Sequence, residues 1–398
     1  MQTSISEIAY MGVDMMGFIN PVLGYLSELS KQGFQIDCYG SKTTFERQFA
    51  PIATNIFDFP DLDMNKTEKN SLQAQIMRAC LKGIPQIEAL WENSQSKPKL
   101  IIADQFALYA GILARKHKIP IIAFCSSFID FSNPKRSLDI KTKEMLEKPF
   151  AEHLQPQIQE IKEKYGIELT KFEQVLVKGD IQISCLPEFW GTHFFPLKKN
   201  EYYIGPGFRD ESADLYSDFD IRNIKDRGDK LIYLSLGTTP SDSKGFYVID
   251  NIIEALKTKE NTTLLIAASM GKAEELKSKG PLPKNVLVYE FVPQYRVLEY
   301  ASLFITHMGA NGTLEAIANG VPIIGIPQGA EQYLNAQIAE ELNIGKWLKS
   351  TTVRDISETI AAVLESQEIQ ANIKKYQAAI DPQQSRKKFV ELVKSIMI

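Results

Sequence analysis

The stretch from His307 to Glu315, HMGANGTLE, has the residue types that bind a phosphate. It joins a histidine to small residues and then to a helix-forming segment that carries a carboxylate. A helix N-terminus leaves backbone N–H groups without partners, and the helix dipole adds positive potential at the same place. The stretch therefore predicts an anion site, most often one for phosphate.

The flanking elements must hold this turn in place. Ala301–Thr306 is an apolar run of strand length, so His307 is expected at a strand's carboxyl end, where open parallel sheets bind ligands. Thr313 is the expected N-cap of the following helix, which puts Glu315 in its first turn. The helix should stop at residues 319–320, and a second buried strand should cover residues 321–327.

The region around this turn resembles the donor-binding signature of the UDP-glycosyltransferase family, in particular its bacterial macrolide- and flavonoid-type members of the GT-B fold. The matching residues are Phe291, Pro293-Gln294, Thr306-His307-Met308-Gly309, Glu315, Gly320-Val321-Pro322 and Glu331-Gln332. So many fixed spacings within one segment are far more specific than a single glycine motif.

The resemblance implies a role for each matching residue. Phe291 would stack on uracil, the Val292 backbone would read its edge, and Gln294 and Glu315 would bind the ribose hydroxyls. Glu331 and Gln332 would bind the sugar, with the glutamine favouring glucose. The diphosphate would lie against a Ser-x-Gly-Thr loop and the helix start, through Gly237, Thr238, His307, Gly309, Asn311, Gly312 and Thr313. Transferases of this kind need no bound metal and no cofactor beyond the UDP-sugar donor.

The turn at residues 17–21 departs from the family pattern. It aligns with a Gly-His-x-Asn-Pro turn, and Phe18 occupies the position of the histidine that deprotonates the acceptor. A phenyl ring has no lone pair and cannot act as a base. Asp104 matches the family's histidine-orienting aspartate and is the first candidate for another base, with Asp14 and His153 behind it. Asp104 could equally be a helix N-cap that follows a strand.

These observations favour an inverting glycosyltransferase that moves a sugar, expected to be glucose, from a UDP-sugar to a small, largely apolar acceptor. Without the usual base, the acceptor atom would be a nitrogen, a sulfur or an acidic phenol oxygen. One alternative is a catalytically silent protein of the same fold that binds nucleotide sugars or aglycones. A nucleotide-sugar epimerase on the same scaffold fits the motif spacing less well.

The chain length of 398 residues suggests two domains. We expect an α/β protein of the GT-B fold, with two Rossmann-like domains whose parallel sheets face across a cleft. Residues 1–207 would bind the acceptor, a charged linker would cover 208–229, and residues 230–382 would bind the nucleotide sugar. The last helix, 383–398, is expected to pack back on the first domain.

The sequence leaves the roles of two segments of the first domain undecided. The aromatic loop 189–195 is expected to pack in the core or between domains or, less often, to form an acceptor platform. The polar segment 130–170 varies within the family and is expected to set acceptor choice.

The composition excludes several classes of protein. A net charge of −4 and a pI of about 5.8 argue against a nucleic-acid partner. The four scattered cysteines predict reduced core thiols and no metal site. With neither a leader pattern nor an apolar run of spanning length, we expect a cytoplasmic protein without a membrane span, either a monomer or a homodimer.

Overall fold

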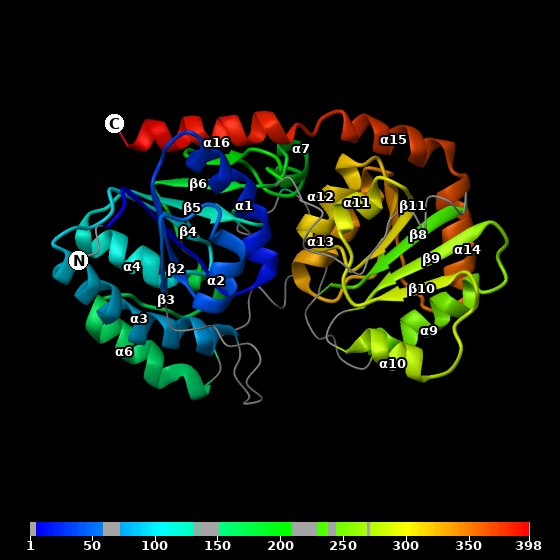
Figure 1. The fold of residues 1–398 in the computed structure, drawn as a ribbon, viewed down its shortest axis with the longest axis horizontal. Helices are drawn as coiled ribbons and strands as arrows, with labels where there is room; N and C mark the ends of the chain where they lie inside the picture. Colours follow the sequence, from blue (N-terminus) through cyan, green and yellow to red (C-terminus); the bar gives the residue numbers. More distant parts are fainter. Residues whose placement is uncertain are drawn as a thin grey trace. The chain divides into compact units, whose positions relative to one another are not determined.

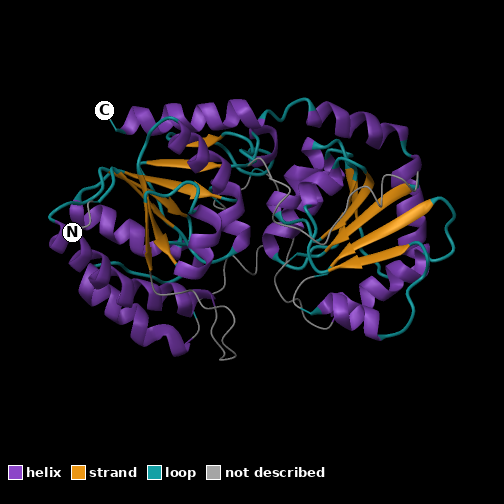
Figure 2. Cartoon of the chain, viewed as in Figure 1, coloured by secondary structure: helices purple, strands orange, loops and turns teal. Residues whose placement is uncertain are grey.

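The computed structural model describes residues 5–58, 72–130, 135, 150, 152–208, 229–237, 244–268 and 271–397. The chain forms two compact units, one with residues 1–209 and 381–398 and the other with residues 210–380. We call them unit 1 and unit 2. Each has a sheet with helices packed against it (Figures 1 and 2).

Unit 1 contains a parallel sheet of seven strands in the order β3-β2-β1-β4-β5-β6-β7. The strands are β1 (Ile8–Met11), β2 (Ile36–Gly40), β3 (Asn55–Asp58), β4 (Leu100–Asp104), β5 (Ile121–Cys125), β6 (Ile181–Ser184) and β7 (Glu201–Tyr203). Four of them, β1, β2, β4 and β5, are buried along their whole length. Burial on both faces explains why the sequence shows apolar runs here instead of alternation.

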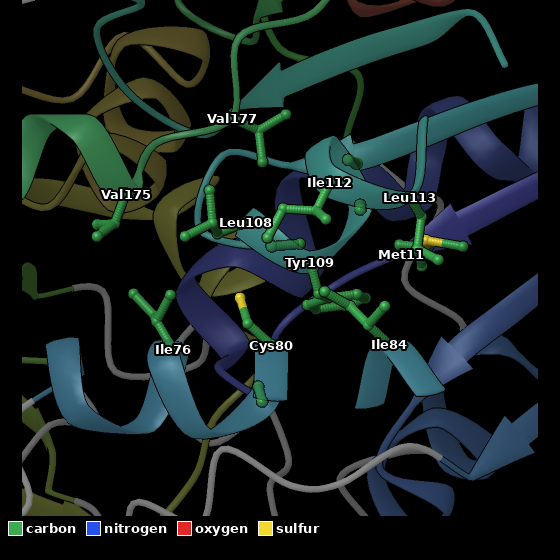
Figure 3. Packing of buried hydrophobic residues seen from close by; sticks show 14 of the residues in the cluster. Met11, Ile76, Cys80, Ile84, Leu108, Tyr109, Ile112, Leu113, Val175 and Val177 are labelled. Carbon is green, nitrogen blue, oxygen red and sulfur yellow. The ribbon is translucent and has the colours of Figure 1, made fainter. Parts of the chain in front are cut away.

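Helices cover both faces of this sheet. They are α1 (Met16–Lys31), α2 (Lys42–Phe49), α3 (Leu72–Ser94), α4 (Leu108–His117), α6 (Gln155–Tyr165), α7 (Glu188–Gly191) and α16 (Pro382–Ile396), with 3-10 turns η1 (Glu152–Leu154) and η2 (Phe172–Val175). On one face, Met11 of β1 packs in the same buried cluster as Cys80 and Ile84 of α3 and Tyr109 and Leu113 of α4 (Figure 3).

The opposite face carries the C-terminal helix. The ring of Tyr25 in α1 lies 5.4 Å from that of Phe124 in β5 and 5.0 Å from that of Phe389 in α16, measured between centroids. Arg386 of α16 also donates to the Phe208 carbonyl at 2.6 Å. α16 therefore packs into unit 1 through an aromatic cluster and a charged hydrogen bond, although the residues directly before it, 210–380, belong to unit 2.

A buried carboxylate ties together the amino ends of the first three strands. Asp37 is fully buried and accepts hydrogen bonds from the Ser6 backbone N–H, the Ser6 hydroxyl and the Asn55 side-chain amide, each at 2.7 Å. Because every bond goes to a buried charged group, this cluster should contribute strongly to stability.

The aromatic loop of unit 1 belongs to the core. Trp190, Phe194 and Phe195 are at most 1% exposed, and the rings of Phe128 and Phe195 meet edge to face at 5.5 Å. The core interpretation of these three residues is thus confirmed. The four cysteines are also all buried, as expected of core thiols.

Unit 2 contains a parallel sheet of six strands in the order β10-β9-β8-β11-β12-β13. The strands are β8 (Lys230–Ser235), β9 (Thr262–Ala267), β10 (Val286–Tyr289), β11 (Ala301–Thr306), β12 (Ile323–Gly325) and β13 (Gly345–Trp347). The predicted strand Ala301–Thr306 is confirmed to the residue, and the one expected at 321–327 is shorter.

The helices of unit 2 also pack on both faces. They are α9 (Lys244–Leu256), α10 (Lys272–Ser278), α11 (Gln294–Leu298), α12 (Ala310–Ala318), α13 (Ala330–Glu341), α14 (Val353–Glu365) and α15 (Gln367–Gln377). On one face, Ile232 and Ile305 of the sheet lie in a buried cluster with Ile252 of α9 and Ile360 of α14. On the other, Phe304 of β11 approaches the α12 backbone at Gly312.

The strand order creates a topological switch point in the sheet of each unit. In unit 2, β8 and β11 are neighbours, and the helices that follow them, α9 and α12, pack on opposite faces. In unit 1, β1 and β4 are neighbours, and α1 and α4 diverge in the same way. Such a switch point leaves a crevice at the carboxyl ends of the two strands, which is where ligands bind in open α/β sheets. The prediction of two Rossmann-like units with parallel sheets is confirmed.

Candidate functional site

The turn after β11 at the switch point of unit 2 is held by a strained residue. Met308 adopts φ = +65°, which a residue other than glycine rarely does. Its side chain is buried over Gly325, and its carbonyl accepts a hydrogen bond of 2.9 Å from the buried Asn335 side chain of α13. Strain that is maintained by surrounding contacts is typical of functional sites. Asn335 was not predicted, although it lies one helical turn after Glu331.

His307 lies between two glycines that leave room for its ring. A Cβ added at Gly237, after β8, would be 2.9 Å from His307 Nε2, and one added at Gly309 would be 2.6 Å from it. Burial lowers the pKa of His307 to about 4, and a hydrogen bond to the Ser235 backbone acts in the opposite direction. The imidazole is therefore neutral at pH 7, with one N–H and one lone pair, and it brings no positive charge to the site.

Helix α12 begins earlier than the sequence suggested. It runs from Ala310, with Gly309 as N-cap in extended conformation, so the prediction of Thr313 as N-cap was wrong. Thr313 is inside the helix and only 1% exposed, and Glu315 lies beyond the first turn. The backbone of a glycine can cap a helix without a side chain. The earlier start brings the N–H groups of the first turn next to His307.

A chain of hydrogen bonds presents the Glu315 carboxylate. Gln294, the first residue of α11, donates from Nε2 to Glu315 Oε2 at 2.5 Å, and its Oε1 accepts from the Tyr233 hydroxyl at 3.1 Å. The Tyr233 ring stacks on Phe304 at 4.9 Å and 7°. This packing fixes the Gln294 amide and, through it, the carboxylate. The two predicted ribose ligands therefore lie together, and Tyr233 is a supporting residue that the sequence did not single out.

Phe291 precedes α11 with its ring in solvent. It is 55% exposed, while the next residue, Val292, is buried. Large aromatic rings are mostly buried in folded proteins, and an exposed ring is available to stack on a planar base. The exposure of Phe291 is consistent with the predicted uracil contact.

The side chain of Gln332 caps the backbone at the start of α13. Its Oε1 accepts from the backbone N–H groups of Gln328 and Gly329, at 2.7 and 3.1 Å. The Nε2 group has no partner among the described residues, so it can still donate to a ligand. Glu331 lies beside it in the first turn of α13. Thr238, also predicted to bind the donor, lies outside the described residues.

The switch point of unit 1 brings Phe18 and Asp104 to one region. Phe18 follows β1 at the start of α1, and its ring lies 4.8 Å from that of Phe106, which follows β4. Asp104 is the last residue of β4 and is 1% exposed. Its Oδ1 accepts from the Phe106 N–H at 2.8 Å, while Oδ2 has no partner among the described residues. Burial raises the pKa of Asp104 to about 7.

The other candidate bases lie in more exposed positions than Asp104. Asp14 lies half-buried in the loop after β1, and His153 is exposed on η1. The pKa of Asp104, about 7, lies near neutrality, where a general base is most effective. The hydrogen bond that Asp104 accepts from the Phe106 N–H closes a local turn. Asp104 does not cap α4, which begins after Ala107.

Comparison with known proteins identifies the family. The model of the family described as UDP-glucoronosyl and UDP-glucosyl transferase matches residues 150–384, more than half of the 398 residues. The chain belongs to this family.

Individual relatives agree with this assignment. The NDP-glycosyltransferase YjiC of Bacillus subtilis (strain 168) is 28% identical over 386 residues, which cover 93% of this chain and 92% of the relative. In structure, this UDP-glycosyltransferase is similar to the calicheamicin glycosyltransferase CalG4, with a TM-score of 0.76, 19% identity and 99% of each chain covered. The kitacinnamycin glycotransferase gives a TM-score of 0.75 at 19% identity, with 98% of this chain and 99% of the other covered.

The resemblance to UDP-glycosyltransferases seen in the sequence is thereby confirmed, and so is the GT-B fold. The protein is a UDP-dependent glycosyltransferase whose donor is a UDP-sugar. In the described part of the chain, no helix is both long and apolar enough to cross a membrane. The same residues contain no group of three His, Cys, Asp or Glu side chains arranged to hold a metal ion.

Proposed function

We propose that this UDP-glycosyltransferase transfers glucose, with inversion, from UDP-glucose to a nitrogen, a sulfur or an acidic phenol oxygen of a small, largely apolar acceptor. The observation that carries this proposal is the pair of rings, Phe18 and Phe106, at the switch point of unit 1. A phenyl ring stands where relatives are expected to have the basic histidine. The acceptor must therefore lose its proton easily or already be nucleophilic.

The donor side is supported by the residues around α12. The first-turn N–H groups of α12, beside His307, offer neutral donors to a diphosphate, and these donors stabilise the charge on departing UDP. Glu315, held by Gln294, can accept from two ribose hydroxyls. A donor without the 2′-hydroxyl would leave part of that carboxylate unpaired, which favours UDP over deoxythymidine donors.

The proposed reaction has a simple balance. The acceptor atom forms a bond to the anomeric carbon while the bond from that carbon to the UDP oxygen breaks, and UDP leaves as an anion. We propose Asp104 as the group that holds the proton released by the acceptor. Its pKa near 7 permits this at neutral pH.

The test is a transfer assay on the purified protein. UDP-glucose is incubated with a panel of arylamines, thiols, acidic phenols and aliphatic alcohols, and glycoside and UDP are measured by mass spectrometry. We expect product with the first three classes and little with the alcohols. Saturable UDP-glucose binding without any product would instead favour a catalytically silent binding protein.

The variant Phe18→His tests the acceptor side. It should gain activity toward alcohols, because an imidazole beside Asp104 restores a base. Phe106→His is the matched control, since it places an imidazole on the partner ring without filling the turn position of the base. Equal alcohol activity in both variants would contradict the role given to position 18.

We further propose that the enzyme works in the cytoplasm as a monomer or homodimer. Four free, buried cysteines fit a reducing compartment. Light scattering of the purified protein and fractionation of cells test the two statements.

A further inference from the structure

Tyr10 is a buried residue of β1 with a polar atom that the packing does not explain. Its ring is fully buried and lies 6.1 Å from the ring of Phe45 and 5.2 Å from that of Phe49, both in α2. The hydroxyl has no hydrogen-bond partner among the described residues. Burying a hydroxyl without a hydrogen-bond partner costs free energy, so such a group is expected to bind a ligand or a water molecule.

A second orphaned atom, Asp104 Oδ2, lies on the same face of the sheet. The register pairs Tyr10 with Ile102 and Met11 with Ala103, which sets Asp104 beside Gly12 one residue later. Alternate residues of a strand share a face, so the side chains of Tyr10 and Asp104 point to the same side. Among charged groups, Asp104 also has the largest effect on the pKa of Tyr10, which it raises.

Gly12 lies next to the Tyr10 hydroxyl. A Cβ added there would be 2.7 Å from the Tyr10 oxygen, so the hydroxyl lies directly over this glycine. Asp104 is in the neighbouring strand, on the same side of the sheet. The two oxygens do not hydrogen-bond to each other, and a single water between them would give each a partner.

We propose that one buried water bridges the Tyr10 hydroxyl and Asp104 Oδ2, and that Tyr10 is thereby a positioning residue for Asp104. Tyr10 donates to the water, and the water donates to Oδ2, so both oxygens of the carboxyl group are fixed. The bridge stabilises the carboxylate over the neutral acid. The inference rests on the proposed function only for the use of Asp104 as the proton holder.

No other group in the described structure performs this task. The titratable side chains that the charge of Asp104 influences are Tyr10 from β1, Tyr109 from α4 and Cys125 from β5. Burial raises the pKa of each, so all three are neutral at pH 7. Tyr109 donates its hydroxyl to the Gly12 carbonyl at 2.8 Å. Among these groups, the Tyr10 hydroxyl is the one placed over Gly12 without a partner of its own.

Infrared titration tests the bridge without any need for activity. The carbonyl band of the protonated Asp104 is identified as the band lost in Asp104→Asn, and its pH midpoint is measured. Tyr10→Phe keeps the ring contacts and should raise this midpoint by about one pH unit, because a donor to the carboxylate is lost. Tyr39→Phe is the control: it removes another buried hydroxyl, bonded to Trp91, and should leave the midpoint unchanged.

An unchanged midpoint in a folded Tyr10→Phe protein would overturn the proposal. If that variant does not fold, a high-resolution crystal structure of the unmodified chain decides, because a water must lie within hydrogen-bonding distance of both oxygens. Absence of glycosyl transfer with a shifted midpoint would refute the proposed function and leave the bridge standing. Where transfer is found, the acid limb of its pH profile should move with the midpoint in Tyr10→Phe.

Discussion

The substitution Gly237→Ala tests whether the loop after β8 and His307 form one donor site. Gly237 has φ = +88°, a conformation that costs a residue with a Cβ about 1–2 kcal/mol. The added methyl group would also stand 2.9 Å from two atoms of the His307 ring, closer than carbon atoms tolerate. The ring must therefore move. If the displaced ring disturbs one of the first-turn N–H groups that bind the diphosphate, the loss of that charged hydrogen bond is worth about 1.5–3 kcal/mol.

Gly271→Ala provides a matched control within the same unit. Gly271 has φ = +77°, and a Cβ there would meet nothing within 4 Å. Urea unfolding should show that both variants lose about 1–2 kcal/mol through backbone strain. Calorimetry with UDP should separate them, because only Gly237→Ala should bind roughly ten- to hundredfold more weakly. Equal UDP affinity in the two variants would refute the placement of the diphosphate beside His307.

Three further predictions concern single carboxylates. Glu315→Ala should weaken UDP binding by roughly tenfold in calorimetry and abolish the preference for UDP over its 2′-deoxy analogue; unchanged affinity would remove the ribose role. Asp37→Ala should lower the free energy of urea unfolding by about 3 kcal/mol or more, because three hydrogen bonds to a buried charge are lost. Asp58→Ala is the control and should lower it much less, because Asp58 accepts a single hydrogen bond, from the exposed Lys42 N–H. The pKa of Asp104 is raised in the folded state to about 7, so its contribution to stability is present in acid and is lost as pH rises from about 4 to 7. Asp104→Asn should therefore unfold less readily than the unmodified protein above pH 7, and a pH-independent difference between them would contradict the buried acid.

The sequence alone determined the strand β11 and the donor motif. β11 was predicted to the residue, because an apolar run bounded by a turn rich in small residues has few other conformations open to it. The motif from Phe291 to Gln332 was also readable, since its members are close in sequence and follow the order of strand, turn and helix.

The sequence could not fix the start of α12. Thr313 is a better N-cap by its side chain than Gly309, and local preference therefore favoured it. Tertiary contacts decide otherwise. Asn335 holds the Met308 carbonyl from a different helix, and the left-handed turn this maintains starts the helix three residues before Thr313.

Only the tertiary structure decided the state of the acid–base groups. Asp104 and His307 have ordinary pKa values as isolated residues, and burial shifts them in opposite directions because it disfavours the charged form of each. The proximity of Tyr10 to Asp104 likewise follows from the pairing of strands far apart in sequence. The order of residues along the chain specifies which groups can react, whereas desolvation and strand register, which exist only after folding, set their protonation and their neighbours.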